Sequence, residues 1–233
     1  MSQAKLGVGN TIQAARVSFE ENRPLIIRLT LAFAALNAIS ALLDLAGPAG
    51  LAISLGITIL LGASYGGMIA AMICLPGKAQ ALGEPWSAVR PVLARLIWVS
   101  LLSALAVLAG LFALIVPGLI VLTLLSVAGQ SVVVERISVI QSFGRSFTLV
   151  KDTAWQVFGY LLVLALLSLV LFGLALLISL PFGAGALGTA VSTFFSNLLS
   201  TPVLAIGSAA LYNQLTDLQR NELPEDEEPP APL

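Results

Sequence analysis

The side chains that could do chemistry in this 233-residue sequence gather in one polar stretch, residues 132–155, VVVERISVIQSFGRSFTLVKDTAW. It supplies two acid–base couples, Glu135 with Arg136 and Lys151 with Asp152, together with Arg145. Such groups could hold a metal ion, relay protons or bind an anion. The sequence has no histidine, on which metal sites and proton relays near neutral pH depend most, so both are disfavoured, although versions built from carboxylates alone stay open.

Nucleophilic catalysis is also disfavoured by the residues present. Serine is abundant, but there is no histidine to act as its base, no GxSxG motif and only one cysteine, Cys74. A serine–lysine arrangement that uses Lys78 or Lys151 stays open. We expect no enzymatic activity, no cofactor and no metal site, and the net charge of −1 gives no reason to expect a nucleic-acid partner.

The elements that must position these groups are apolar and long. Hydrophobic residues make up 58% of the chain, above the roughly 45–50% of a soluble domain. A span of about 20 apolar residues can cross a bilayer as a helix, because every backbone polar group must be paired internally there. The sequence therefore predicts an all-α polytopic membrane protein with six transmembrane helices, at about residues 25–43, 49–75, 92–116, 118–134, 154–180 and 186–212.

The third and fourth spans could instead be one kinked helix, because residues 111–122 contain no polar side chain. The distribution of Lys and Arg favours two spans that meet at Pro117–Gly118. With six crossings all eleven basic residues fall on one side, whereas a single helix would put Arg95 and Arg136 on opposite sides. This positive-inside pattern predicts a bacterial inner-membrane protein with three helical hairpins and both termini in the cytoplasm.

Two polar segments flank the predicted spans. Residues 1–24 have weak helical periodicity and predict a cytoplasmic amphipathic helix that Pro24 limits, with a cleaved secretory signal as the disfavoured alternative. Residues 213–233 predict a cytoplasmic tail that is acidic and disordered, with five acids between residues 222 and 228.

Within the polar stretch, residues 138–151 predict an interfacial helix. Val139, Phe143, Phe147 and Val150 fall on one face, and Trp155 follows at an aromatic-belt position. We expect Arg145 and Lys151 to point at anionic head groups; a topological anchor and a specific lipid or partner site are both open. The candidate lipid- or partner-binding residues are Arg90, Arg95, Arg136, Arg145 and Lys151.

Uncharged polar residues inside the spans suggest a second possibility. Most are expected to form interhelical hydrogen bonds, but some could line a cavity. No charge lies near the bilayer centre, which disfavours a proton- or ion-coupled transporter. The candidate cavity-lining residues are Asn37, Gln130, Ser196 and Asn197.

The polar stretch also resembles a known family. An outer Pro–Gly turn, a span, an acid at Glu135 and a segment I-x-S-F-x-R-S-F-x-L-V-K-D-x-x-W resemble the glycerophosphoryl diester phosphodiesterase membrane-domain family and the related YciC-like bacterial integral membrane proteins. In those, an A-x-x-R-S-W-x-L-x-x-G-x-x-W segment occupies this place. Phe147 replaces its first tryptophan and Lys151–Asp152 its glycine region; the matching residues are Ser142, Arg145, Ser146, Leu149 and Trp155.

The resemblance implies a membrane domain and not a catalytic one. Some members carry a phosphodiesterase barrel that depends on histidine, which this sequence lacks. We therefore expect a non-catalytic inner-membrane scaffold or accessory domain that engages the lipid bilayer, anionic phospholipid head groups, or a membrane or cytosolic protein partner through its basic cytoplasmic face. The alternative is a small-solute or lipid transporter with a pathway between the helices.

Overall fold

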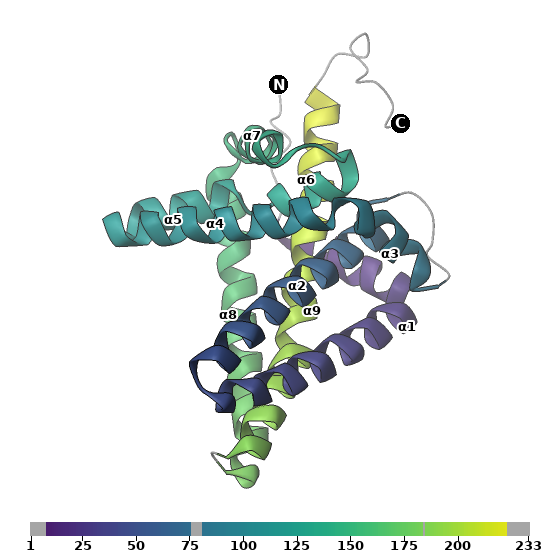
Figure 1. Cartoon of the computed structure of the whole chain (residues 1–233). Helices are drawn as coiled ribbons and strands as arrows, with labels where there is room; N and C mark the ends of the chain where they lie inside the picture. The colour runs from purple at the N-terminus through teal and green to yellow at the C-terminus, as the bar shows by residue number, and fades with distance from the viewer. Residues whose placement is uncertain (1–7, 76–80, 184, 223–233) are drawn as a thin grey trace.

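The computed structural model describes residues 8–75, 81–183 and 185–222, and their regular structure is entirely helical (Figure 1). Six segments are long and apolar enough to cross a membrane, which confirms the predicted all-α class with six spans. The first and third segments begin 16 and 9 residues before the predicted spans, and the sixth ends 8 residues after its predicted span. The bounds of the six segments are Gly9–Ala46, Pro48–Cys74, Gly83–Phe112, Val116–Glu135, Ala154–Phe182 and Ala186–Arg220.

The long helices are arranged as three hairpins. In the first, α1 (Val8–Ala41) and α2 (Pro48–Cys74) are joined by a 3₁₀ turn, Leu42–Ala46. In the second, α4 (Leu93–Ala113) is followed by α5 (Ile115–Leu124), and in the third α8 (Ala154–Ser179) by α9 (Ala186–Glu222). The turn of the first hairpin ends at Gly47, whose φ of 82° lies in the left-handed region that glycine adopts without a Cβ clash.

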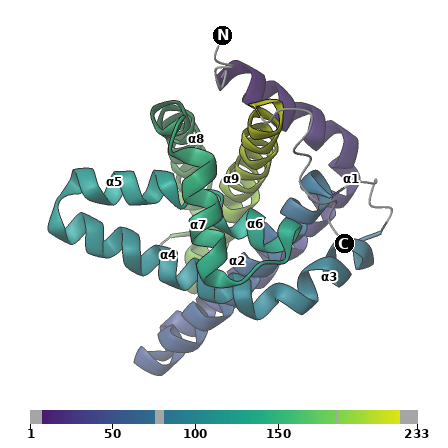
Figure 2. The ribbon, with the colours of Figure 1, turned by 90° about the horizontal axis from the view of Figure 1, so that it is seen from above.

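The first helix differs from the prediction, because Pro24 does not end it. Pro24 lies inside α1 and has no N–H to donate to the carbonyl of Glu20, so it kinks the helix instead; Figure 2 shows α1 changing direction in its first half. Both sides of the proline pack on α9. Thr11 donates to Gln214, and Leu25 shares a buried cluster with Ile206. Residues 1–7 of the predicted amphipathic helix, and residues 223–233 of the predicted tail, lie outside the described residues.

The turn of the second hairpin lies at Leu114, three residues before the predicted Pro117–Gly118 turn. Leu114 is extended, with φ −168° and ψ 150°, and Pro117 and Gly118 lie in the first turn of α5. The two helices touch backbone to backbone, because a Cβ added at Gly110 would lie 2.8 Å from the Cα of Gly118. The third and fourth spans are therefore separate helices joined by a turn and not one kinked helix.

The fourth span is not one continuous helix. After α5 ends at Leu124 the chain makes an irregular turn and resumes as α6 (Ala128–Glu135). The amide of Ala128 donates to Leu125 and that of Ser126 to Thr123, so the carbonyl of Leu124 loses its usual partner four residues later.

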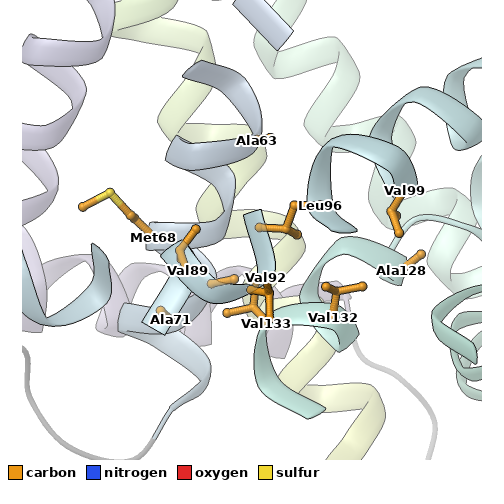
Figure 3. Close-up of a cluster of buried hydrophobic side chains, with 11 residues drawn as sticks. Ala63, Met68, Ala71, Val89, Val92, Leu96, Val99, Ala128, Val132 and Val133 are labelled. Carbon is orange, nitrogen blue, oxygen red and sulfur yellow. The ribbon is translucent and has the colours of Figure 1, made fainter. Parts of the chain in front are cut away.

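The three hairpins converge at one end of the molecule and diverge toward their turns (Figures 1 and 2). The convergent end, which we call the basic end, consists of α3 (Gly83–Val89), α6, α7 (Val139–Val150), the first half of α1 and the last turns of α9. A buried cluster there joins α2, α3, α4 and α6, with Val89, Val92, Leu96 and Val132 among its members (Figure 3). The hairpin turns, which we call the tips, carry no basic residue.

Candidate functional site: a basic face around α7

Helix α7 is fixed at its start by its own sequence. The hydroxyl of Ser138 accepts from the amide of Gln141, and the side chain of Gln141 accepts from the amide of Ser138, which is a capping box. The helix then begins at Val139, one residue after the start of the predicted interfacial segment. A capped twelve-residue helix thus links the fourth and fifth spans.

The orientation of α7 differs from the predicted one. Ser142, Ser146 and Val150 are buried against the rest of the protein, whereas Ile140 is 83% exposed and Phe147 is exposed. The predicted apolar face is therefore divided, with Val150 inside and Phe147 outside. Arg145 and Ser146 turn inward, where they have hydrogen-bond partners on other helices, and Leu149 is also buried, whereas Ile140 and Phe147 turn outward.

Ser146 supplies a hydrogen-bond donor at the break in the fourth span. Its hydroxyl donates to the carbonyl of Leu124 at 2.7 Å, the group that the break between α5 and α6 leaves without a helical partner. An unpaired carbonyl in an apolar layer costs free energy comparable to a lost hydrogen bond. Ser146 therefore makes the break tolerable, which is a structural role for a residue of the motif.

Arg145 is also turned inward, contrary to the expectation that it faces lipid head groups. Its Nε donates to Glu135 Oε1 at 2.7 Å and its Nη1 to Gln219 Oε1 at 2.5 Å. Tyr212 donates to the same carboxylate oxygen at 2.8 Å. The Arg145 and Glu135 side chains are 26% and 28% exposed, so the pair is partly shielded from water. These contacts tie α7 to α6 and α9.

Arg95 and Arg136 meet at the start of α4. Nη1 of Arg95 donates to the backbone carbonyl of Arg136 at 2.9 Å, and both residues are exposed. Arg136 caps the end of α6 with φ 54°, the one left-handed backbone at a non-glycine residue within the described chain. A cation beside the last carbonyls of a helix is favoured by the helix dipole.

Arg90 and Lys151 are the other two exposed residues among the candidate lipid-binding residues. Arg90 lies just before α4 and Lys151 just after α7, and both are exposed. Within residues 8–75, 81–183 and 185–222, none of Arg90, Arg95, Arg136 and Lys151 forms an ion pair. Trp98 and Trp155, exposed by 57% and 82%, lie at the starts of α4 and α8 in the same region. We call the four exposed cations the basic face.

The hydrogen bonds of the four candidate cavity-lining residues do not join these residues to one another. Gln130 donates to Ser208 at 2.8 Å and so joins α6 to α9. Asn37 and Asn197 each donate to a carbonyl of their own helix, at Phe33 and Thr193. The Ser196 hydroxyl is buried and has no hydrogen-bond partner among the described residues. Among the described residues, no group of three His, Cys, Asp or Glu side chains could hold a metal ion.

Sequence reasoning missed Tyr212 and Gln219, the α9 partners of the Glu135–Arg145 pair. They lie seven residues apart, with Leu215 between them on the same face of the helix. A polar residue at each end of an apolar two-turn stripe is a weak signal, and nothing in the sequence relates it to residues 135 and 145.

A helical chain with six apolar segments of this length is a polytopic membrane protein. Its sequence matches a family described as a domain of unknown function, DUF7847, over residues 52–215, and the chain belongs to that family. The match runs from within α2 to Leu215 of α9, so it includes the basic face and α7. No curated protein and no solved structure matches the chain.

Proposed function

We propose that the protein is a non-catalytic scaffold or accessory domain of the bacterial inner membrane that engages anionic phospholipid through the basic face, with a partner protein as the second kind of ligand. In this proposal the basic end and both termini lie in the cytoplasm. The observation that carries it is the exposure of four cations that form no ion pair with the described residues, at one end of the molecule only. Cytoplasmic basic residues and anionic lipid are matched in this way across inner membranes.

Arg145 takes a different role in the proposal. Because its guanidinium is bound to Glu135 and Gln219, we assign it to positioning α7 and not to binding lipid. The outward side chains of α7, with Ile140 the most exposed, would then lie in the head-group layer beside Lys151. This arrangement is typical of an interfacial helix that buries an apolar face and keeps its charges at the surface.

We also infer a distant relationship to the glycerophosphoryl diester phosphodiesterase membrane-domain family. The support is the use made of its motif here, since Arg145 and Ser146 both hold α7 against neighbouring helices. A motif that serves packing can be shared by proteins with different activities, so the relationship assigns no phosphodiesterase chemistry to this chain.

The experiment is native mass spectrometry of the detergent-purified protein in a mixture of phosphatidylglycerol and phosphatidylethanolamine. We expect wild type to retain phosphatidylglycerol preferentially, and Arg90→Gln/Lys151→Gln to lose several-fold of that preference, because each basic group near a surface contributes about 1 kcal/mol. Arg16→Gln is the matched control, since Arg16 is already paired with Glu20. Equal retention of both lipids by wild type would contradict the proposal.

A further inference from the structure

Along one face of α4, a basic, an aromatic and two apolar side chains follow one another in the same order as the phosphate, glycerol layer and acyl chain of a phospholipid. Arg95, Trp98, Leu102 and Leu105 follow at intervals of three and four residues, so they share a face of the helix. All four are exposed, with Trp98 at 57%. A guanidinium suits a phosphate, an indole the glycerol layer and leucines an acyl chain. The face therefore matches one lipid molecule lying along α4.

The second arginine, Arg136, has a backbone conformation that is unfavourable for a residue with a Cβ atom. Arg136 has φ 54°, a conformation that glycine adopts freely and other residues at some cost. At the end of α6, the backbone carbonyl of Arg136 accepts a hydrogen bond from the Arg95 side chain. A glycine would offer the same carbonyl with less strain, so the arginine side chain is not explained by that contact.

The bond between the two residues also orients Arg95. Its Nη1 is held 2.9 Å from the Arg136 carbonyl, which leaves its other N–H groups available. Neither arginine forms an ion pair with any residue that the structure describes. An exposed guanidinium held beside a second exposed arginine, with no acidic partner among the described residues, favours an external anion, and arginine binds phosphate through two parallel hydrogen bonds.

We propose that Arg95 and Arg136 form a binding site for the phosphate of an anionic phospholipid, with the lipid's acyl chain along Trp98, Leu102 and Leu105. This inference rests on the proposed function and makes it specific. The basic face then contains one site with defined partners, and Arg90 and Lys151 add attraction for anionic lipid head groups outside that site.

The test uses Trp98 as a reporter of the site. The chain has three tryptophans, so Trp86→Phe/Trp155→Phe leaves Trp98 alone. This protein is placed in phosphatidylcholine bilayers that contain a small fraction of brominated phosphatidylglycerol or of brominated phosphatidylcholine. We expect brominated phosphatidylglycerol to quench Trp98 fluorescence at several-fold lower mole fraction. Arg136→Gly and Arg95→Gln should each weaken that preference about fivefold.

Arg136→Gly is the decisive variant, because glycine suits the left-handed backbone and should leave the melting temperature unchanged or higher. Arg16→Gln should keep the wild-type preference. If wild type retains phosphatidylglycerol in the mass spectra while Trp98 is quenched equally by both brominated lipids, this site is wrong and the proposed function stands. If neither measurement shows a preference, both fail.

A soluble phosphate is the other source of the same chemistry. The quenching is repeated with inorganic phosphate in place of chloride at equal ionic strength. We expect quenching by brominated phosphatidylglycerol to be unchanged. Release of the quenching by inorganic phosphate would assign the arginine pair to a soluble phosphate compound and overturn the lipid assignment.

Discussion

The basic end and the α4–α5 hairpin are held together by different interactions. At the basic end, side-chain hydrogen bonds join separate helices, as between Arg145 and Gln219 or between Asn213 and the carbonyl of Ile73. In residues 100–122 of the α4–α5 hairpin, no side-chain hydrogen bond reaches another described element. There the close approach of Gly110 and Gly118 brings the two backbones together.

The third span, which contains α4, is also little buried. Of its most apolar window 17% is buried within the protein, against 44% for the first span and 39% for the fourth. In an apolar layer, leucine gains little by leaving lipid for another leucine, so helix association depends on close packing and on polar contacts. Polar contacts between helices are therefore found mainly at the basic end, and the residues of the proposed lipid-binding face lie at the same end.

The largest expected effect is the loss of Arg145. Arg145→Ala removes the ion pair with Glu135 and leaves Gln219 without its donor. Because the pair is about a quarter exposed, we expect the free energy of unfolding to fall by about 2–3 kcal/mol, somewhat less than for a fully buried pair. The measurement is equilibrium unfolding in mixed micelles.

The chain contains a matched control for that prediction. Arg16 and Glu20 form an ion pair whose side chains are 78% and 60% exposed, so Arg16→Ala should change stability by well under 1 kcal/mol. Equal effects of the two substitutions would show that the Arg145 contacts contribute no more than a surface pair, and the contrast between the two regions would disappear.

A smaller effect is expected in the α4–α5 hairpin. Gly110→Ala places a Cβ 2.8 Å from the Cα of Gly118, and because the obstacle is backbone the two helices must move apart. We expect a loss of about 1–2 kcal/mol, within the range for overpacked sites. Gly173→Ala in α8, where a Cβ meets nothing within 4 Å, should cause no loss. A neutral Gly110→Ala would show that packing does not hold this hairpin.

The sequence predicts the fold of this protein better than its site. Apolar length and the Gly and Pro breaks are local properties, and they predict the number of spans, six, and the start of α7 to within one residue. The inward turn of Arg145 is not local, because it depends on Glu135 and Gln219, which are 10 and 74 residues away. Periodicity identifies a face of α7 but cannot say which neighbours satisfy its polar groups.

The break between α5 and α6 and the continuation of α1 through Pro24 could not be predicted from the sequence for a related reason. The break between α5 and α6 contains no glycine or proline, and it persists because Ser146 supplies a donor to Leu124 from another helix. Pro24 shows the converse, since a residue that ends helices lies inside α1 where α9 packs on both sides of it. In both cases a tertiary contact overrides the local preference.

The smallest expected effect concerns Gln130, whose amide joins α6 to α9 through Ser208. It was a candidate to line a pathway, but its amide is bound to a neighbouring helix. Gln130→Ala should lower the free energy of unfolding by about 0.6 kcal/mol, the usual contribution of such a bond in a membrane protein.

Asn197→Ala is the matched control for Gln130→Ala, because the Asn197 amide donates only within its own helix. Its effect should be smaller still. If Gln130→Ala lowers the free energy of unfolding as much as Arg145→Ala does, then a polar contact within the spans is as strong as the one at the basic end. The division between a polar basic end and spans held by packing would then be wrong, because a neutral amide pair would be stabilising the spans as strongly as the charged cluster stabilises α7.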